Sequence, residues 1–186
     1  MVSGWRVTVV RVSPKPVVRR VSYGTNTVNW GRLLKGLFNA VAAGGFSSIT
    51  LRDDGGTDRT GYIKEGRTFN GYILDVLVGY TDVASLRVWG RLGTGTTAAS
   101  RTQHNLVTPA GTYFELASNY DDGDVVTLTG TASFDTPISP TEAGLFIDLG
   151  NGEEPGGVAK YMLDRTVFPA LPPGTLFTVR WDIELQ

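Results

Sequence analysis

The chain has 186 residues, of which 41% are hydrophobic, so it can bury one substantial core and does not require two domains. Its formal net charge is -1 with acidic and basic residues interleaved, which is not the basic surface expected of a nucleic-acid-binding protein. It contains no cysteine, which excludes disulfides and cysteine-ligated metal, and no apolar run of the roughly 20 residues that cross a membrane. We therefore expect a single domain, residues 1–186, without nucleic-acid or membrane partners.

The N-terminal stretch GWRVTVVRV alternates in a way that predicts a β-strand. Prolines in the following SPKPVV cannot donate to a sheet ladder, which places this strand at a sheet edge. We interpret residues 1–22 as a possible intersubunit strand or arm, with Trp5, Arg19 and Arg20 as its contacts. A chain lacking residues 1–20 is then expected to fold without assembling. The alternative is an outer strand of the chain's own sheet.

The stretch NWGRLLKGLFNAVAAGG differs from the rest because its apolar residues fall at helical spacing. It predicts one α-helix near residues 29–43, with Asn29 as its cap and Gly44 and Gly45 as its end. This helix is expected to pack on a β-core or to close one end of it.

Most of the remaining chain reads as short strands separated by turn clusters rich in Gly, Asp, Asn and Pro. The clearest alternation is in DVVTLTGTASF and TLFTVRWDIEL, and weaker alternation marks GYILDVLVGY, SLRVWGRLG, GTYFELAS and VAKYMLDRTVF. Long strands with one polar face favour an antiparallel sheet. The predicted fold is mainly β, a single-domain antiparallel β-sandwich that is jelly-roll-like and carries one helix.

Residues that could carry chemistry are few, and each has a structural interpretation. His104, the one histidine, has no nucleophile-elbow motif to accompany it and is expected to be an ordinary loop residue. The acidic stretches DDGGTD and NYDDGD could offer oxygen ligands to calcium, but their residues are also those that turns require. RLGTGTTAASR lacks the lysine of a phosphate-binding loop. We expect no catalytic residue, metal or cofactor.

The stretch PTEAGLFIDLGNG leaves two interpretations open for Glu142. With Asp148, Glu153 and Glu154 nearby in sequence, it could belong to a carboxylate pair of the glycosidase kind. Alternatively, it could fix a corner of the sheet.

Three stretches in this order, LGTGTTAASRTQHNL, TEAGLFID and YMLDRTVFPALPPGTLFTVRWDIEL, resemble structural proteins of tailed phages and related archaeal viruses. The resemblance covers most of the chain and is carried by the order and spacing of its elements, which are residues 93–97, Leu106, and residues 142–146, 163–168 and 178–181.

The resemblance implies a non-enzymatic component of the virion, a capsid decoration or minor capsid protein, or else a tail, baseplate or fibre component. Its partners would be copies of itself in a homo-oligomer and other virion proteins. It also favours the structural interpretation of Glu142, whose carboxylate could accept backbone N–H groups or pair with Arg165 while Gly144 allows close backbone approach. The alternative from another class is a carbohydrate-binding module or glycan-acting enzyme, in which exposed Trp and Tyr side chains would stack on sugars.

Overall fold

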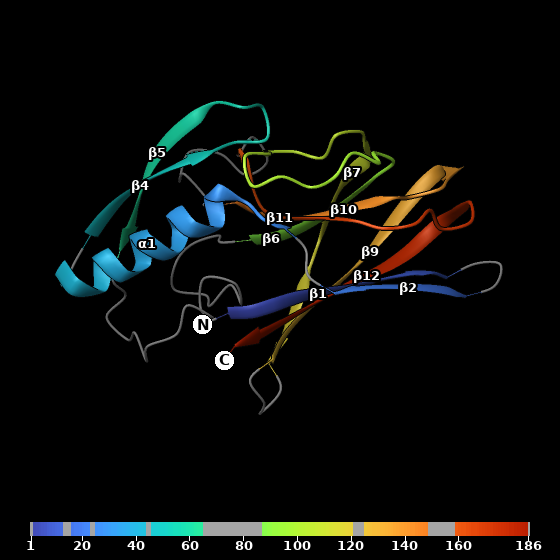
Figure 1. Ribbon diagram of the computed structural model, residues 1–186, viewed down its shortest axis with the longest axis horizontal. Helices are drawn as coiled ribbons and strands as arrows, with labels where there is room; N and C mark the ends of the chain where they lie inside the picture. Colours follow the sequence, from blue (N-terminus) through green and yellow to red (C-terminus); the bar gives the residue numbers. More distant parts are fainter. Residues whose placement is uncertain are drawn as a thin grey trace.

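The computed structural model describes residues 2–12, 16–22, 25–43, 46–64, 87–120, 125–148 and 159–185, and these form two β-sheets, one helix and one hairpin (Figure 1). Sheet A contains, in spatial order, β2 (Val17–Ser22), β1 (Val2–Arg11), β12 (Gly174–Leu185), β9 (Val125–Ile138) and β8 (Ala117–Tyr120). Sheet B contains β3 (Thr25–Asn26), β11 (Lys160–Val167), β10 (Glu142–Asp148), β6 (Arg87–Gly93) and β7 (Pro109–Glu115). The strand pairs are antiparallel, so the predicted antiparallel β-sandwich is confirmed.

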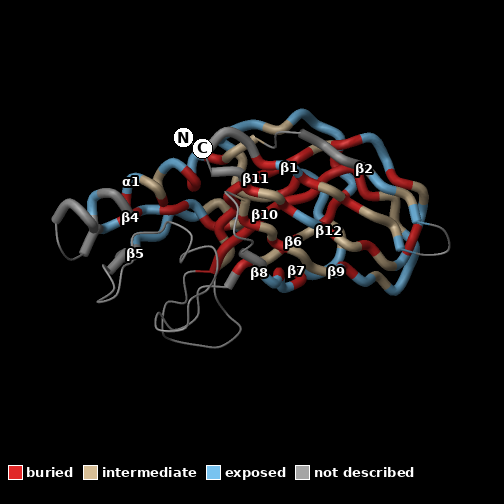
Figure 2. Tube along the Cα trace, turned by 90° about the horizontal axis from the view of Figure 1, so that it is seen from below, coloured by how far each residue is buried: buried red, intermediate tan, exposed pale blue. Residues whose placement is uncertain are grey.

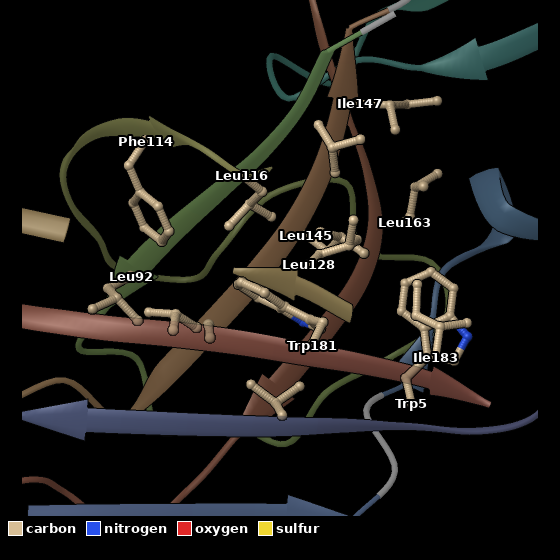
Figure 3. Close-up of a cluster of buried hydrophobic side chains, with 14 of the residues drawn as sticks. Trp5, Leu92, Phe114, Leu116, Leu128, Leu145, Ile147, Leu163, Trp181 and Ile183 are labelled. Carbon is tan, nitrogen blue, oxygen red and sulfur yellow. The ribbon is translucent and has the colours of Figure 1, made fainter. Parts of the chain in front are cut away.

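The core lies between the two sheets because each strand turns alternate apolar side chains inward. In β12 the inward positions are Phe177, Val179, Trp181 and Ile183, and each has 0% of its surface exposed. Figure 3 shows two of them, Trp181 and Ile183, on the same side as side chains of sheet B such as Leu145 and Leu163, with which they form one core cluster. The half-buried strand predicted from TLFTVRWDIEL is thus confirmed, and it lies in the middle of its sheet.

The sequence suggested that the first strand lies at a sheet edge, and the structure shows that it does not. β1 pairs with β12 on one side and with β2 on the other. Its inward side chains Trp5, Val7 and Val9 are buried in the core. Pro16 does not end the sheet but directly precedes β2, which is the edge strand, while Pro14 lies outside the described residues. A chain without residues 1–20 would lose an inner strand, and this argues against the expectation that it still folds.

Helix α1 spans Val28–Ala43, close to the predicted range. Its N-cap is Thr27, whose carbonyl accepts the N–H of Trp30 at 3.2 Å, and Asn29 instead lies inside the first turn. The helix packs on the hairpin of β4 (Phe46–Arg52) and β5 (Asp58–Lys64), and the three elements lie together at one end of the molecule (Figure 1). Figure 2 shows buried positions between the two sheets and a mixture of buried and exposed positions along α1 and β4.

Asn29 joins the helix to the hairpin and to sheet B. Its side-chain amide accepts the N–H of Arg52 at 2.8 Å and donates to the carbonyl of Arg52 at 2.7 Å, as a neighbouring strand would. It also donates to the carbonyl of Met162 at 3.3 Å. Asn29 therefore fixes where α1 and β4 meet the edge of β11.

Within the described part of the chain, no helix has the length and apolarity needed to span a membrane. The predicted strand GYILDVLVGY, the end of NYDDGD, and the acidic residues Glu153 and Glu154 lie outside the described residues.

Candidate functional site

Glu142, at the start of β10, is the acceptor at the centre of a buried hydrogen-bond network. Its side chain is fully buried, and Oε1 accepts the backbone N–H groups of Gly95 at 3.0 Å and Thr108 at 2.8 Å. Oε2 accepts the N–H of Val107 at 3.2 Å. All three donors belong to the connection between β6 and β7, residues 94–108, which contains neither helix nor strand. The carboxylate therefore holds both ends of this connection against sheet B.

Arg165, on the neighbouring strand β11, supplies the compensating charge. Its Nε donates to Glu142 Oε2 at 2.7 Å, and its Nη2 lies 2.6 Å from the same oxygen. Nη1 donates to Gln103 Oε1 at 2.9 Å, and that oxygen also accepts the N–H of Ser100 at 2.8 Å. A buried charge is stable only when it is paired and hydrogen-bonded, and here both conditions hold for each partner.

Glycines in the sequence LGTGTT make room for the carboxylate. A Cβ atom at Gly93 would lie 2.5 Å from Glu142 Oε1, and one at Gly95 would lie 2.6 Å from it. Both distances are shorter than van der Waals contact allows, so the two glycines serve close packing rather than phosphate binding. Gly144 has the same role further along β10, where a Cβ atom would lie 2.6 Å from the ring of Phe146.

Thr141 completes the network beside Glu142. Its hydroxyl donates to the carbonyl of Gly95 at 3.0 Å, and its N–H donates to the carbonyl of Gly93 at 2.9 Å. The N–H of Thr94 donates to the carbonyl of Thr108 at 2.9 Å and closes the connection at its base. Because both carboxylate oxygens are occupied and buried, Glu142 in this arrangement is a structural clamp that no substrate reaches.

The geometry does not join Glu142 to Asp148 in a glycosidase-type pair. They begin and end the same strand, and six residues of strand span about 20 Å, whereas the paired carboxyl groups of glycosidases lie about 5 to 9.5 Å apart. Asp148 instead pairs with Lys160 Nζ at 2.9 Å.

The stretch DDGGTD forms the turn between β4 and β5. Asp53 Oδ1 accepts the N–H of Thr57 at 2.7 Å, Asp53 Oδ2 accepts Arg59 Nε at 2.5 Å, and Gly56 has the positive φ of 86° that such a turn requires. Burial alone would raise the pKa of Asp53, but the hydrogen bonds and the charge of Arg59 outweigh it and hold that pKa below its usual value. Asp54 accepts the hydroxyl of Tyr113 at 2.5 Å.

His104 packs against this turn rather than against a nucleophile. A Cβ atom at Gly56 would lie 3.0 Å from His104 Nε2. Among the hydrogen bonds of the described residues, none joins His104 to a serine or an aspartate. The described residues also contain no group of three or more His, Cys, Asp or Glu side chains placed to hold a metal ion.

Two half-buried aromatic side chains lie on the outer face of sheet B, the face turned away from sheet A. Trp89 has Lys160 Nζ 4.6 Å from its ring centroid, and Tyr113 has the Arg91 guanidinium carbon 4.7 Å from its own. Each ring thus already carries a cation over one face. The side chains of Trp5, Trp30 and Trp181 are buried, with 1%, 5% and 0% of their surfaces exposed.

The residues expected at a subunit contact are separated by the structure. Trp5 packs edge-to-face on Trp30, with ring centroids 4.9 Å apart, and is part of the core, so it is corrected from a surface contact to a core residue. Arg19 and Arg20 lie on the edge strand β2, opposite Val9 and Thr8 of β1, and their side chains are outside the described part of the chain. Val18 on the same strand is 47% exposed.

Comparison with known protein families, curated proteins and solved structures finds no match for this chain. The candidate site is therefore assigned from its own geometry.

Sequence reasoning missed the polar groups that face the interior of the sandwich. Asp164 and Thr166 of β11 are buried, with 0% and 2% of their surfaces exposed. The adjacent residues Asp164 and Arg165 point to opposite faces of sheet B, one into the core and one toward Glu142. The one signal in the sequence was an acidic residue that directly follows the apolar residues YML in the predicted strand.

Proposed function

We propose that this protein is a non-enzymatic structural protein of a virus particle, a capsid decoration or minor capsid component that acts through repeated contacts with copies of itself and with other virion proteins. The observation that supports this most is the clamped connection 94–108. Connections of this length without helix or strand are usually either functional or disordered. Here a buried ion pair and backbone hydrogen bonds hold the connection in one conformation.

A surface that is ordered before it binds loses little conformational entropy on binding. The clamped connection presents mostly small uncharged side chains to solvent together with one exposed charged residue, Arg101, and Val107 is 46% exposed. A closed symmetric assembly repeats each such contact many times, so a modest patch suffices to hold the particle together. Binding through repeated contacts suits a small domain whose buried charged groups stabilise its own fold and are not available to a partner.

The edge strand β2 offers a second surface. Its outer side has no strand partner within the described residues, and Val18 there is exposed. Exposed strand edges pair readily with strands from other chains. A tail, baseplate or fibre location would use the same two surfaces and is the alternative within this class.

The carbohydrate-binding alternative receives less support. It needs aromatic rings with a free face, and the half-buried rings of Trp89 and Tyr113 each have a cation over one face. A glycan array probed with the purified chain addresses it directly. Binding that is lost in Trp89→Ala would favour this alternative over the virion proposal.

The main test is to purify virus particles from a culture that produces this chain and to quantify the chain across density-gradient fractions by mass spectrometry. We expect it to sediment with the particles at a fixed ratio to the major capsid protein. Its absence from particle fractions would overturn the proposal.

A pair of variants tests whether the clamped connection makes the contact. Val107→Lys should lower the amount of chain on particles, whereas Thr131→Lys, at an exposed position of β9, should leave it unchanged. Equal incorporation of both variants would show that the connection 94–108 does not form the contact. The virion proposal itself would still be decided by the sedimentation experiment.

A further inference from the structure

Asp164 lies in the interior of the sandwich, where a carboxylate is not expected. It is opposite Leu145 on β10, and its side chain is fully buried. Oδ2 accepts the hydroxyl of Thr166 at 3.1 Å, while Oδ1 has no hydrogen-bond partner. A charged carboxylate with so few partners is costly in an apolar interior.

Asn26 on β3 is the cross-strand partner of Asp164 in the register of sheet B, so the two side chains lie on the same face. Its Oδ1 is likewise buried without a hydrogen-bond partner. Two acceptor oxygens cannot bond to each other. A protonated Asp164 has a hydrogen-bond donor to offer on this face, whereas a charged Asp164 has none.

Among the residues that the structure describes, no cation near Asp164 contributes to its pKa in favour of the charged form. Arg165 and Glu142 project to the outer face of sheet B and pair with each other. On β12, Arg180 and Asp182 flank Trp181 and also pair with each other, at 2.6 Å. β3 contributes Thr25 and Asn26, which carry no charge.

The balance of these effects favours the protonated acid. Burial raises the pKa of Asp164, hydrogen bonding from Thr166, Trp181 and the backbone N–H of Arg165 offsets this only in part, and the resulting pKa is about 7. The Trp181 indole N–H does not reach good hydrogen-bond geometry. Asp164 therefore changes its charge near neutral pH.

The element that can give way most easily is β3, which has two residues. It is followed by Thr27, whose N–H donates to the carbonyl of Leu163 at 2.8 Å and whose hydroxyl donates to that of Met162 at 2.5 Å. We propose that Asp164 is a proton-controlled latch, which holds β3 and the start of α1 on the edge of β11 when protonated and loosens them when charged. Opening of β3 would let water reach the carboxylate.

The sign of the effect follows from the two pKa values. An unfolded aspartic acid has a pKa of about 3.9, so between about pH 4 and 7 the folded chain binds more protons than the unfolded chain. The contribution of Asp164 to stability is therefore fully present below about pH 4. As the pH rises from about 4 to 7, the equilibrium constant for folding falls by up to about tenfold per pH unit. Above about pH 8 this contribution no longer changes.

The test is amide hydrogen exchange of the full chain between pH 5.5 and 8.5, corrected for the intrinsic rate. Protection of the Thr27 amide should fall by about tenfold or more as the pH rises, while the amides of β12 keep much more of their protection. Asp164→Asn, which is neutral at every pH, should abolish the pH dependence at Thr27. Asp135→Asn, at an exposed aspartate of β9, is the matched control and should retain it.

Equal pH dependence in Asp164→Asn and wild type would overturn the latch, and so would a loss of protection that is uniform over both sheets. If Asp164→Asn does not fold, infrared difference spectroscopy of the wild type decides. A buried protonated carboxyl band at pH 5.5 that disappears by pH 8.5 supports the latch. A carboxylate that is already charged at pH 5.5 refutes it.

Discussion

Arg165 and Glu142 meet across two neighbouring strands through a 2.7 Å hydrogen bond, and neither side chain has any surface exposed to solvent. The pair does not lie between the sheets but beneath the connection 94–108, on the outer face of sheet B. This buried ion pair therefore fixes a surface feature of the molecule, and its loss should affect that surface as well as stability.

Glu142→Gln should lower the free energy of unfolding by about 3 to 5 kcal/mol, because it leaves the buried charge of Arg165 uncompensated. Urea unfolding measures the change. Asp182→Asn, which breaks the exposed pair with Arg180, is the control and should cost less than about 1 kcal/mol. The double variant Glu142→Met with Arg165→Leu should recover part of the loss. Similar costs for Glu142→Gln and Asp182→Asn would contradict the clamp.

Two glycine variants separate close packing from backbone flexibility. Gly95→Ala places a Cβ atom 2.6 Å from Glu142 Oε1, and we expect it to destabilise the fold by about 1 to 3 kcal/mol. Gly31→Ala, in α1, meets nothing within 4 Å and should stabilise the protein by about 0.5 to 1 kcal/mol through helix propensity. Thermal unfolding of both variants checks this. If Gly95→Ala left the stability unchanged, that result would contradict the tight packing around Glu142.

Trp181→Ala should cost about 3 to 5 kcal/mol, as the truncation of large buried aromatic residues does. Trp181 is fully buried on the central strand of sheet A, opposite Val7 and Leu128. Thr178→Ala on the outer face of the same strand is the matched control and should cost much less. A loss below 1 kcal/mol for Trp181→Ala in reversible urea unfolding would contradict the strand register.

Removal of residues 1–20 should unfold the protein rather than merely prevent its assembly, because β1 brings Trp5, Val7 and Val9 into the core. Circular dichroism should show the loss of the cooperative β-sheet unfolding transition. For the chain without residues 1–20, native-like cooperative unfolding would show that β1 is dispensable for folding.

Val18→Lys tests the edge strand β2 without changing the core. It should keep the free energy of unfolding within about 0.5 kcal/mol of wild type while reducing self-association in sedimentation velocity.

Alternation predicted the strands that have one wet face, of which β12 is the clearest, because a period of two is visible in the residues themselves. The prolines of SPKPVV wrongly suggested that β1 lies at a sheet edge, since the number of partners of a strand depends on where distant strands pair. Alternation missed the inward position of Asp164, because the register of β10 and β11 shifts between Leu145 and Phe146. That bulge turns Asp164 inward, and a bulge leaves no mark in hydrophobic periodicity.

The candidate site was predictable in part. A carboxylate after a turn, followed by an arginine on the next strand, is enough to suggest a pair between Glu142 and Arg165. The third component, the connection that receives the carboxylate, is not visible in sequence, because its donors are backbone N–H groups that every residue possesses. The glycines of LGTGTT were its one trace, and they are also common in flexible loops.

The cap of α1 has a consequence for solubility. Thr27 and Asn29 occupy the carbonyls of Met162 and Leu163, and the N–H of Asp54 occupies that of Lys160 at 2.8 Å, so this edge of sheet B cannot act as a template for a foreign strand. On the same side of the sandwich, β2 leaves the edge of sheet A open within the described residues. On this side of the sandwich, an incoming strand thus has one sheet to extend rather than two, which gives any such contact there a direction.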